Sequence, residues 1–147
     1  ISACLVGSEM CIRDRSEVLH QMGLLRPTGT FRKAYQYSNF PYTEAGIAAA
    51  RAAGKPWEDL AEERLFKSLG VHSTSYRYSD YTDRINKAAI HVIVDGKPVA
   101  RYQRDPDAEA PAGGASSSVR DLAEWLRLQL AGGTWNGQSI NCGRCFE

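Results

Sequence analysis

The sequence predicts a mainly helical α+β chain with one β-hairpin. Two helical patterns of apolar residues follow each other closely, at 40–53 and 56–69, and a glycine comes directly after each. Asp95-Gly96 stands between two apolar runs, as in a two-residue hairpin turn. Hydrophobic residues make up 43% and charged residues 24% of the 147 residues, values typical of a globular domain.

The first expected helix covers 16–25, because its apolar residues recur at helical spacing. A loop rich in turn residues is expected at 26–30. The aromatic-rich segment 31–39 lacks a helical period, and we interpret it as an extended or irregular approach to the next helix.

The helix at 40–53 should begin after Asn39, a favourable N-cap residue, with Pro41 in its first turn. Its predicted packing face consists mainly of small residues, which would let another helix approach closely. That face comprises Tyr42, Ala45, Gly46, Ala49 and Ala53.

The helix at 56–69 starts with Pro56 and carries acidic residues in its first turn, which complement the helix dipole. Its apolar residues form one stripe, which predicts a side that faces the core. The stripe comprises Trp57, Leu60, Ala61, Leu65 and Leu69.

The middle of the chain is expected to contain the hairpin between two long connections. The polar, tyrosine-rich segment 71–86 indicates a surface connection. Strands at 89–94 and 97–103 form the hairpin, and Pro98 marks the second as an edge strand. The segment 104–117 is expected to be a loop, because Pro, Ala, Gly and Ser dominate it.

The last expected helix begins at a capping-box pattern, Ser118-Val119-Arg120-Asp121, and ends at Gly132-Gly133. Its apolar residues share one face, and the tryptophan among them is expected in the core. These residues are Leu122, Trp125, Leu126 and Leu130.

The composition and charge of the chain argue against several classes of function. The net charge of +1 gives no electrostatic basis for binding nucleic acid, so none is expected as a partner. No apolar run approaches the ~20 residues that a membrane span needs. No signal peptide is visible, because the apolar run at 1–6 is short, has no basic residue before it and is followed by Glu9.

The two ends of the chain differ in character from the rest. All four cysteines lie there, at Cys4, Cys11, Cys142 and Cys145. The last two have the spacing of half a zinc site or a redox pair, but the first two are spaced loosely for zinc, so no metal is expected.

The segment 7–15 also resembles a translated sequencing adapter. We therefore expect residues 1–15 to be non-native, 16–140 to be part of a domain and 141–147 to be a doubtful tail.

Five segments, in this order, resemble the serine β-lactamase-related family, which includes class C β-lactamases, penicillin-binding proteins and carboxylesterase-like enzymes. The segments are 31–39 with Tyr37-Ser38-Asn39, the helix with Ala45-Gly46, and then 54–59, 64–70 and 111–117. The resemblance covers 16–140. The resemblance implies a β-lactamase/transpeptidase-like fold, with a helical subdomain packed against an α/β sheet domain. It is also compatible with a periplasmic or extracellular location.

The resemblance also implies the roles of particular residues. Members of the family attack a carbonyl with the serine of a Ser-x-x-Lys motif and pass through an acyl-enzyme. Tyr37 matches the tyrosine that helps the lysine to move the proton. Asn39 matches the amide that orients the lysine and the substrate, since an amide both donates and accepts hydrogen bonds. Gly113 and Gly114 match a loop that approaches the substrate.

The nucleophile motif is missing from this sequence. No serine is followed by a lysine three residues later, and neither Lys-Thr-Gly nor His-x-Gly follows the last helix. The sequence therefore predicts a piece of a serine hydrolase, inactive alone and without a cofactor. Its parent would cleave a small ester, amide or peptide, with β-lactams and D-amino peptides included.

Two alternatives remain open at the level of the sequence. One is a non-catalytic relative that binds a cell-wall fragment or peptide. The other is an interaction module held together by a metal at the terminal cysteines.

Overall fold

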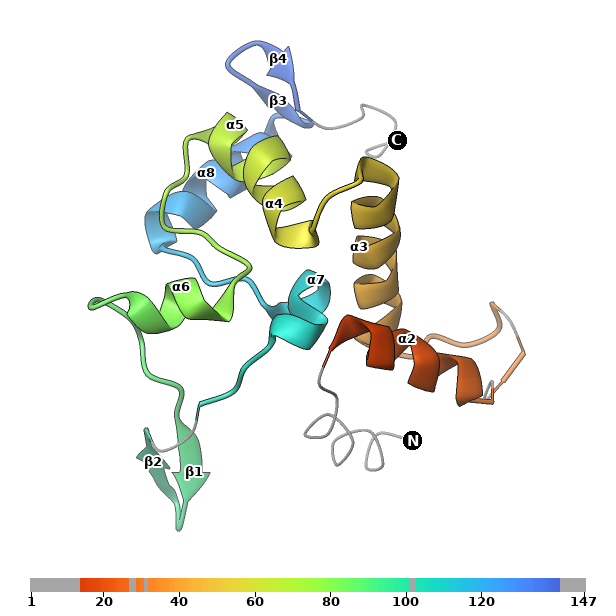
Figure 1. Cartoon of the computed structure of the whole chain (residues 1–147). Coiled ribbons are helices and arrows are strands. Elements are labelled where there is room, and N and C mark those ends of the chain that lie inside the picture. The colour runs from red at the N-terminus through yellow and green to blue at the C-terminus, as the bar shows by residue number, and fades with distance from the viewer. Residues whose placement is uncertain (1–13, 27–28, 31, 101–102, 141–147) are drawn as a thin grey trace.

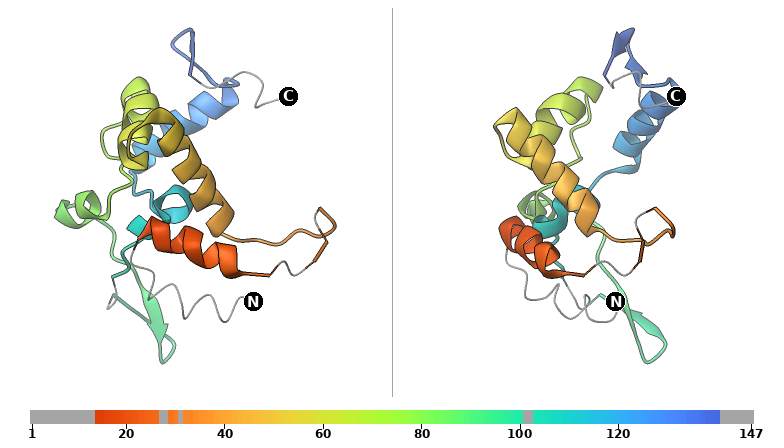
Figure 2. Two further views of the ribbon diagram at one scale, coloured as in Figure 1. Left: turned by 45° about the vertical axis from the view of Figure 1, so that its right-hand side comes forward. Right: turned by 90° about the vertical axis from the view of Figure 1, so that its right-hand side faces the viewer.

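The structure, a computed structural model, describes residues 14–26, 29–30, 32–100 and 103–140. Helices dominate it, and the two hairpins project from opposite ends (Figures 1 and 2). The α+β class predicted from the sequence is confirmed.

The elements are α2 (Arg15–Leu24), α3 (Phe40–Ala53), α4 (Trp57–Ala61), the π-helical turn η1 (Glu62–Phe66), α5 (Lys67–Leu69), α6 (Tyr78–Asp83), β1 (Val92–Val94), β2 (Lys97–Val99), the 3₁₀ turn η2 (Asp107–Glu109), α7 (Ala110–Gly113), α8 (Val119–Leu130), β3 (Thr134–Trp135) and β4 (Gln138–Ser139).

Helix α2 confirms the helix predicted at 16–25, with its bounds one residue earlier. The Asp14 carboxylate caps it by accepting a hydrogen bond from the Glu17 backbone N–H at 2.9 Å. Arg15 ties the helix to the rest of the fold, because its guanidinium pairs with Glu58 and donates to the backbone oxygen of Asp107 at 2.8 Å. The origin of residues 1–15 stays a prediction.

Helix α3 begins and ends as predicted, with Asn39 at the N-cap position and Gly54 in a left-handed conformation (φ 65°) after its last turn. Its buried residues are Phe40, Thr43 and Gly46. The packing face predicted for this helix is therefore wrong apart from Gly46. The other members, Tyr42, Ala45, Ala49 and Ala53, are exposed.

The contact at Gly46 explains why the buried face differs. A Cβ atom added at Gly46 would lie 2.4 Å from Cβ and 2.6 Å from Cγ of Pro111. Pro111 belongs to the first turn of α7, a short helix in the segment where the sequence predicted only a loop. That prediction is wrong because the proline packs on the bare backbone of α3, a tertiary contact that local composition does not reveal.

The predicted helix at 56–69 is confirmed as α4, η1 and α5, and it ends at Gly70 (φ 68°). Its middle departs from α-helical geometry, because the Lys67 N–H bonds to the carbonyl of Glu62, five residues earlier. Phe66, which was not on the predicted stripe, is buried in the core beside Ala61, while Leu65 of the stripe is partly buried and packs against that core.

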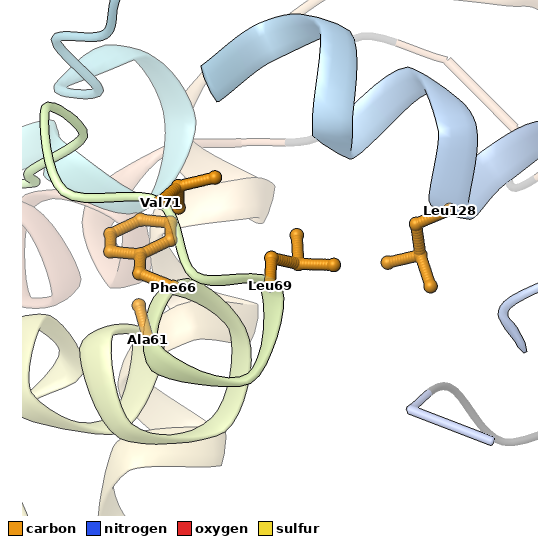
Figure 3. Packing of buried hydrophobic residues seen from close by; sticks show 5 residues of the cluster. All are labelled: Ala61, Phe66, Leu69, Val71 and Leu128. Atoms are coloured by element: carbon orange, nitrogen blue, oxygen red, sulfur yellow. The ribbon is translucent and has the colours of Figure 1, made fainter. Parts of the chain in front are cut away.

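The main hydrophobic core lies between this helix and α8. It comprises Ala61, Phe66, Leu69, Val71 and Leu128, and Figure 3 shows Leu69 and Leu128 facing each other. The half-buried Tyr76 ring packs edge-on to Trp57 at 5.3 Å and stacks on Phe66 at 5.6 Å. Burial raises the pKa of the Tyr76 phenol.

The connection at 71–86 is therefore not simply a surface segment. Val71 and Ser75 are buried, and the segment also contains α6. The sequence-based interpretation failed because the apolar contacts of this segment come from residues distant in the chain, and its own composition is polar.

A cluster of hydrogen bonds fixes the start of α8. The hydroxyl of Ser118 accepts a hydrogen bond from the Asp121 N–H at 3.2 Å, which confirms the predicted cap. The Asp121 carboxylate accepts from the Ser73 N–H at 2.7 Å and from the Thr74 hydroxyl at 2.8 Å. Ser75 and Ser116 exchange two backbone hydrogen bonds beside it, at 3.0 and 2.9 Å.

The hairpin predicted at Asp95-Gly96 is confirmed, with shorter strands than expected. Both turn residues have positive φ, 49° and 75°, as a type I′ turn requires. Val92 pairs with Val99. A second hairpin, β3–β4, turns at Asn136-Gly137 and was not predicted. Among the described residues, no helix is long and apolar enough to span a bilayer.

We predict that Asp121→Asn lowers the free energy of unfolding by about 1–2 kcal/mol near pH 7, because charged acceptors form stronger hydrogen bonds. Burial by itself would raise the pKa of Asp121, but hydrogen bonds from Thr74, Ser73 and Ser118 lower it overall. The Asp121 carboxylate therefore stabilises the fold fully at pH values above 3.8, its ordinary pKa. This stabilisation is lost as the pH falls through the lower pKa that Asp121 has in the folded state.

Urea unfolding at about pH 7 and about pH 3 measures this effect. The difference between the two chains should shrink at the lower pH. Asp95→Asn is the control, since asparagine suits the same hairpin turn and should change stability by less than ~0.5 kcal/mol. A difference for Asp121→Asn that does not vary with pH would contradict the assignment.

Candidate active site

The Tyr37-Ser38-Asn39 motif directly precedes α3 and is held by its first turn. Phe40 and Thr43 are buried and anchor that turn. The Thr43 hydroxyl donates to the backbone oxygen of Asn39 at 3.3 Å, and the Ser38 hydroxyl accepts from the Phe40 N–H at 3.4 Å. The motif therefore begins where an irregular segment becomes a fixed helix.

The side chains of Tyr37 and Asn39 contact each other. The Tyr37 hydroxyl donates to Oδ1 of Asn39 at 3.0 Å. Asn39 makes no side-chain cap bond to α3, so the capping expected of its side chain is wrong, and its amide oxygen serves the phenol instead. Within the described residues no hydrogen bond engages the Nδ2 group, whose two N–H donors could bind a substrate or a further side chain.

The Tyr37 side chain is largely exposed. The residue is 75% exposed and lies beside the first turn of α3 rather than in an apolar core. An aromatic side chain with a packing role is ordinarily half-buried or more. The exposure therefore leaves the phenol accessible to a ligand.

The two glycines predicted to approach the substrate have different environments. Gly114 is buried, and a Cβ atom there would lie 2.5 Å from Cα of Ala110, so its small size is needed for packing. Gly113 is exposed, and a Cβ atom there would meet nothing within 4 Å. Both follow Pro111, which holds α7 against α3, so the two predicted parts of the site are carried by elements in contact.

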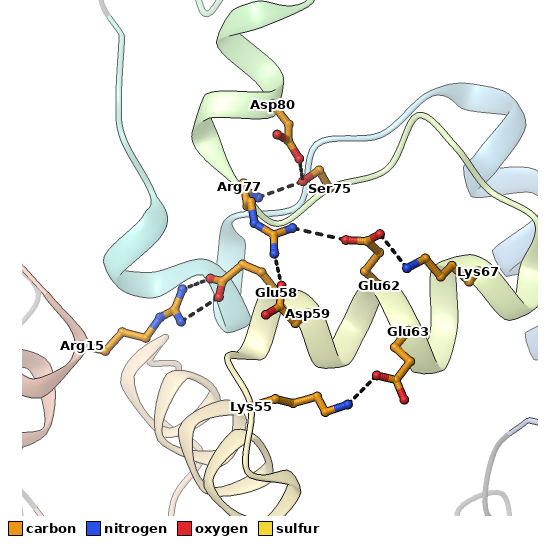
Figure 4. A network of polar contacts seen from close by, with 10 residues as sticks. All are labelled: Arg15, Lys55, Glu58, Asp59, Glu62, Glu63, Lys67, Ser75, Arg77 and Asp80. Carbon is orange, nitrogen blue, oxygen red and sulfur yellow. Dashed lines mark hydrogen bonds and ion pairs between the residues drawn. The ribbon is translucent and has the colours of Figure 1, made fainter.

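The two best-formed clefts in the described part of the chain measure about 230 Å³ each, and neither is lined by Tyr37, Asn39 or the two glycines. The first lies beside a network of ion pairs (Figure 4). Arg77 pairs with Asp59 and, at 3.4 Å, with Glu62, which Lys67 also approaches at 3.1 Å.

These ion pairs keep the carboxylates charged. The hydrogen bond and the charge of Lys67 lower the pKa of Glu62. Burial alone would raise the pKa of Glu58, but the hydrogen bond from Arg15 lowers it overall. The network therefore ties helices together, and its Glu58 and Glu62 carboxylates are ionised at neutral pH.

The described residues contain no group of three or more His, Cys, Asp or Glu side chains placed to hold a metal ion. The four cysteines considered as a metal site lie outside the described residues.

A model of the Beta-lactamase family matches residues 9–140. The chain belongs to the beta-lactamase family. This confirms the family resemblance read from the sequence. None of the curated proteins matches the chain.

Solved structures confirm the β-lactamase-like fold. The beta-lactamase/D-alanine carboxypeptidase from Pseudomonas syringae superposes with a TM-score of 0.66 and 22% identity, over 88% of this chain and 35% of its own. The D-amino acid amidase from Ochrobactrum anthropi SV3, complexed with D-phenylalanine, gives 0.64 and 21% identity, over 80% of this chain and 37% of its own. The chain thus spans about a third of the length of these beta-lactamase-like structures.

Thr43 is a contributor that sequence reasoning missed. A threonine one turn after Asn39 can bond back to that residue's carbonyl, and here it does so while fully buried. The signal was a β-branched polar residue in the first turn of the predicted helix, four positions after Asn39.

We predict that Tyr37→Phe changes the free energy of unfolding by less than ~0.5 kcal/mol, because an exposed hydroxyl bonded to a partly exposed amide exchanges readily with water. Urea denaturation of the two chains measures this. A loss above ~1.5 kcal/mol would show that the hydroxyl serves packing and stability instead of a site.

Proposed function

We propose that this chain is part of a serine hydrolase that cleaves an ester or amide bond through an acyl-enzyme, with Tyr37 and Asn39 in its active site. The observation that carries the proposal is the exposed Tyr37 hydroxyl, bonded to Asn39 at the start of α3, in a member of the beta-lactamase family. The serine and lysine would come from polypeptide outside this chain, since the sequence has no Ser-x-x-Lys motif.

The proposed chemistry assigns a separate task to each side chain. The serine oxygen forms a bond to the substrate carbonyl carbon while its proton passes, through Tyr37 and the lysine, to the leaving alcohol or amine. The bond to the leaving group then breaks and leaves an acyl-enzyme. Water attacks the acyl carbon, gives its proton back to the serine and releases the acid. The Asn39 amide donates to the substrate while its oxygen holds the phenol.

The structural relatives favour amides and peptides as the substrate class. One relative is an amidase of D-amino acids, and another is a beta-lactamase/D-alanine carboxypeptidase. We therefore place amides and small D-amino peptides first, with esters and β-lactams also in range. Gly113, exposed at the end of α7, would lie along the substrate. Residues 16–140 would form this part of the domain.

A second candidate is a non-catalytic relative that binds a peptide or cell-wall fragment. Such a protein would keep the Tyr37–Asn39 pair but carry no Ser-x-x-Lys motif anywhere in its full length. The DNA flanking the reading frame distinguishes the two, because an intact motif upstream supports the enzyme and its loss supports the binding protein.

We predict that the 147-residue chain alone releases no product from a chromogenic ester, a chromogenic β-lactam or a D-amino acid anilide. The full-length protein encoded by the parent gene should release product with a burst. Tyr37→Phe in that protein should lower kcat at least ~100-fold, as expected for loss of a proton-transfer group.

Tyr35→Phe is the matched control, because Tyr35 is the same residue type two positions earlier and is 88% exposed. It should leave kcat within about twofold. Full activity in Tyr37→Phe, or burst kinetics from the 147-residue chain, would refute the proposal.

A further inference from the structure

The hairpin β1–β2 belongs to an arm that projects away from the helices (Figures 1 and 2). We call residues 84–104 the basic arm. It contains five basic residues and one acidic residue, whereas the whole chain has 18 basic and 17 acidic residues. Positive charge is therefore concentrated in this one segment. The basic residues are Arg84, Lys87, Lys97, Arg101 and Arg104, and the acidic residue is Asp95.

Two tyrosines of α6 hold the base of the basic arm. The Tyr81 hydroxyl donates to the backbone oxygen of Ala88 at 2.6 Å, and the Tyr78 hydroxyl donates to Oε1 of Gln103 at 3.3 Å. The two tyrosine rings stack with their centroids 6.0 Å apart. Both ends of the arm are thus attached to one short helix, and the hairpin lies beyond this attachment.

Three cations of the basic arm have no carboxylate partner within the described residues. Arg84 donates to the backbone oxygen of His72 at 3.1 Å, and Lys87 donates to the backbone oxygen of Thr82. These acceptors are neutral. Lys97, at the start of β2, is exposed. The arm therefore carries positive charge that the rest of the described fold does not neutralise, and such charge attracts an anionic partner.

The basic arm also exposes large apolar side chains. Ile85 is fully exposed, and Ile90 and Ile93 are 44% and 70% exposed. Ile93 is paired with Pro98 across the hairpin, so one side of this two-stranded sheet presents apolar groups to solvent. A two-stranded hairpin is at best marginally stable in water, and burying such side chains against another surface is favourable.

An anionic lipid surface fits both properties of the basic arm. Its phosphate groups attract lysine and arginine, and the boundary between headgroups and acyl chains accepts apolar side chains. A nucleic acid would use the cations but would leave the isoleucines exposed. We propose that the basic arm binds the surface of an anionic phospholipid bilayer through Lys87, Lys97 and Ile93. The proposal does not depend on the hydrolase chemistry assigned to Tyr37.

Sedimentation with lipid vesicles tests this proposal on the 147-residue chain. One set of vesicles contains phosphatidylcholine alone, and the other contains phosphatidylcholine mixed with phosphatidylglycerol. The chain should bind the mixed vesicles and bind the neutral vesicles much more weakly. Added salt should weaken the binding, because it screens the attraction between the arm and the headgroups.

Removing two charges from the arm should weaken the binding. Lys87→Gln combined with Lys97→Gln should lower the affinity for mixed vesicles roughly 20- to 30-fold, at about fivefold for each lysine. Arg51→Gln combined with Arg64→Gln is the matched control. It removes the same charge from exposed positions on the helices and should change the affinity less than about threefold, since salt screens distant charges.

Two single substitutions separate the apolar contribution from the charge. Ile93→Gln should weaken binding to mixed vesicles about tenfold, because the apolar group no longer enters the lipid. Asp95→Asn suits the same hairpin turn and removes the acidic residue of the arm, so it should strengthen binding about fivefold. A gain of affinity cannot arise from a disturbed fold.

Equal affinities of the parent chain and the double lysine variant for mixed vesicles would overturn the proposal. An equal loss in the arginine control would do so as well, because overall charge would then explain the binding. Tighter binding to a DNA duplex than to mixed vesicles, unaffected by Ile93→Gln, would assign the arm to nucleic acid instead. None of these measurements uses a substrate, so their outcome is separate from that of the hydrolase proposal.

Discussion

The close approach of α7 to α3 at Gly46 is the constraint on which the arrangement of the candidate site depends. Pro111 occupies the space that any side chain at position 46 would need. Helix α3 carries Tyr37 and Asn39 at its start, and α7 carries Gly113 at its end. A bare glycine in the middle of one helix therefore sets where both predicted parts of the site can lie.

Other long-range contacts connect the remaining helices to the fold. Arg15 joins α2 to Glu58 and to the Asp107 carbonyl, while Asp121 joins α8 to the segment before α6. These contacts are polar and involve only a few atoms each, whereas much of the apolar surface of α8 is exposed. The described residues thus resemble one side of a larger domain, which agrees with the share of the matched structures that the chain covers.

Features set by neighbouring residues could be predicted from the sequence. The glycine ends of α3 and α5, the Ser118 cap and the Asp95-Gly96 turn each depend on local backbone geometry, and all were found. The Tyr-x-Asn spacing likewise located a pair of side chains that are bonded to each other.

Features set by distant residues could not be predicted in this way. Helix α7 forms in a stretch of loop-like composition because Pro111 packs on Gly46. No local pattern predicts the π-helical turn, and Phe66 within it is buried in the core although the regular helical period did not place it there. Trp125 lies on an apolar stripe, but it is 41% exposed because nothing in the described residues covers it.

Alanine substitution of two helical glycines tests the central constraint most directly. Gly46→Ala forces a methyl group against Pro111, which should lower the free energy of unfolding by about 1–3 kcal/mol as in other overpacked sites. Gly23→Ala in α2 meets nothing within 4 Å and should leave stability unchanged or raise it by up to ~1 kcal/mol through helix propensity. Urea unfolding that places Gly46→Ala clearly below both Gly23→Ala and the parent chain supports the account. Equal or greater stability of Gly46→Ala would show that α7 does not pack on α3 as described.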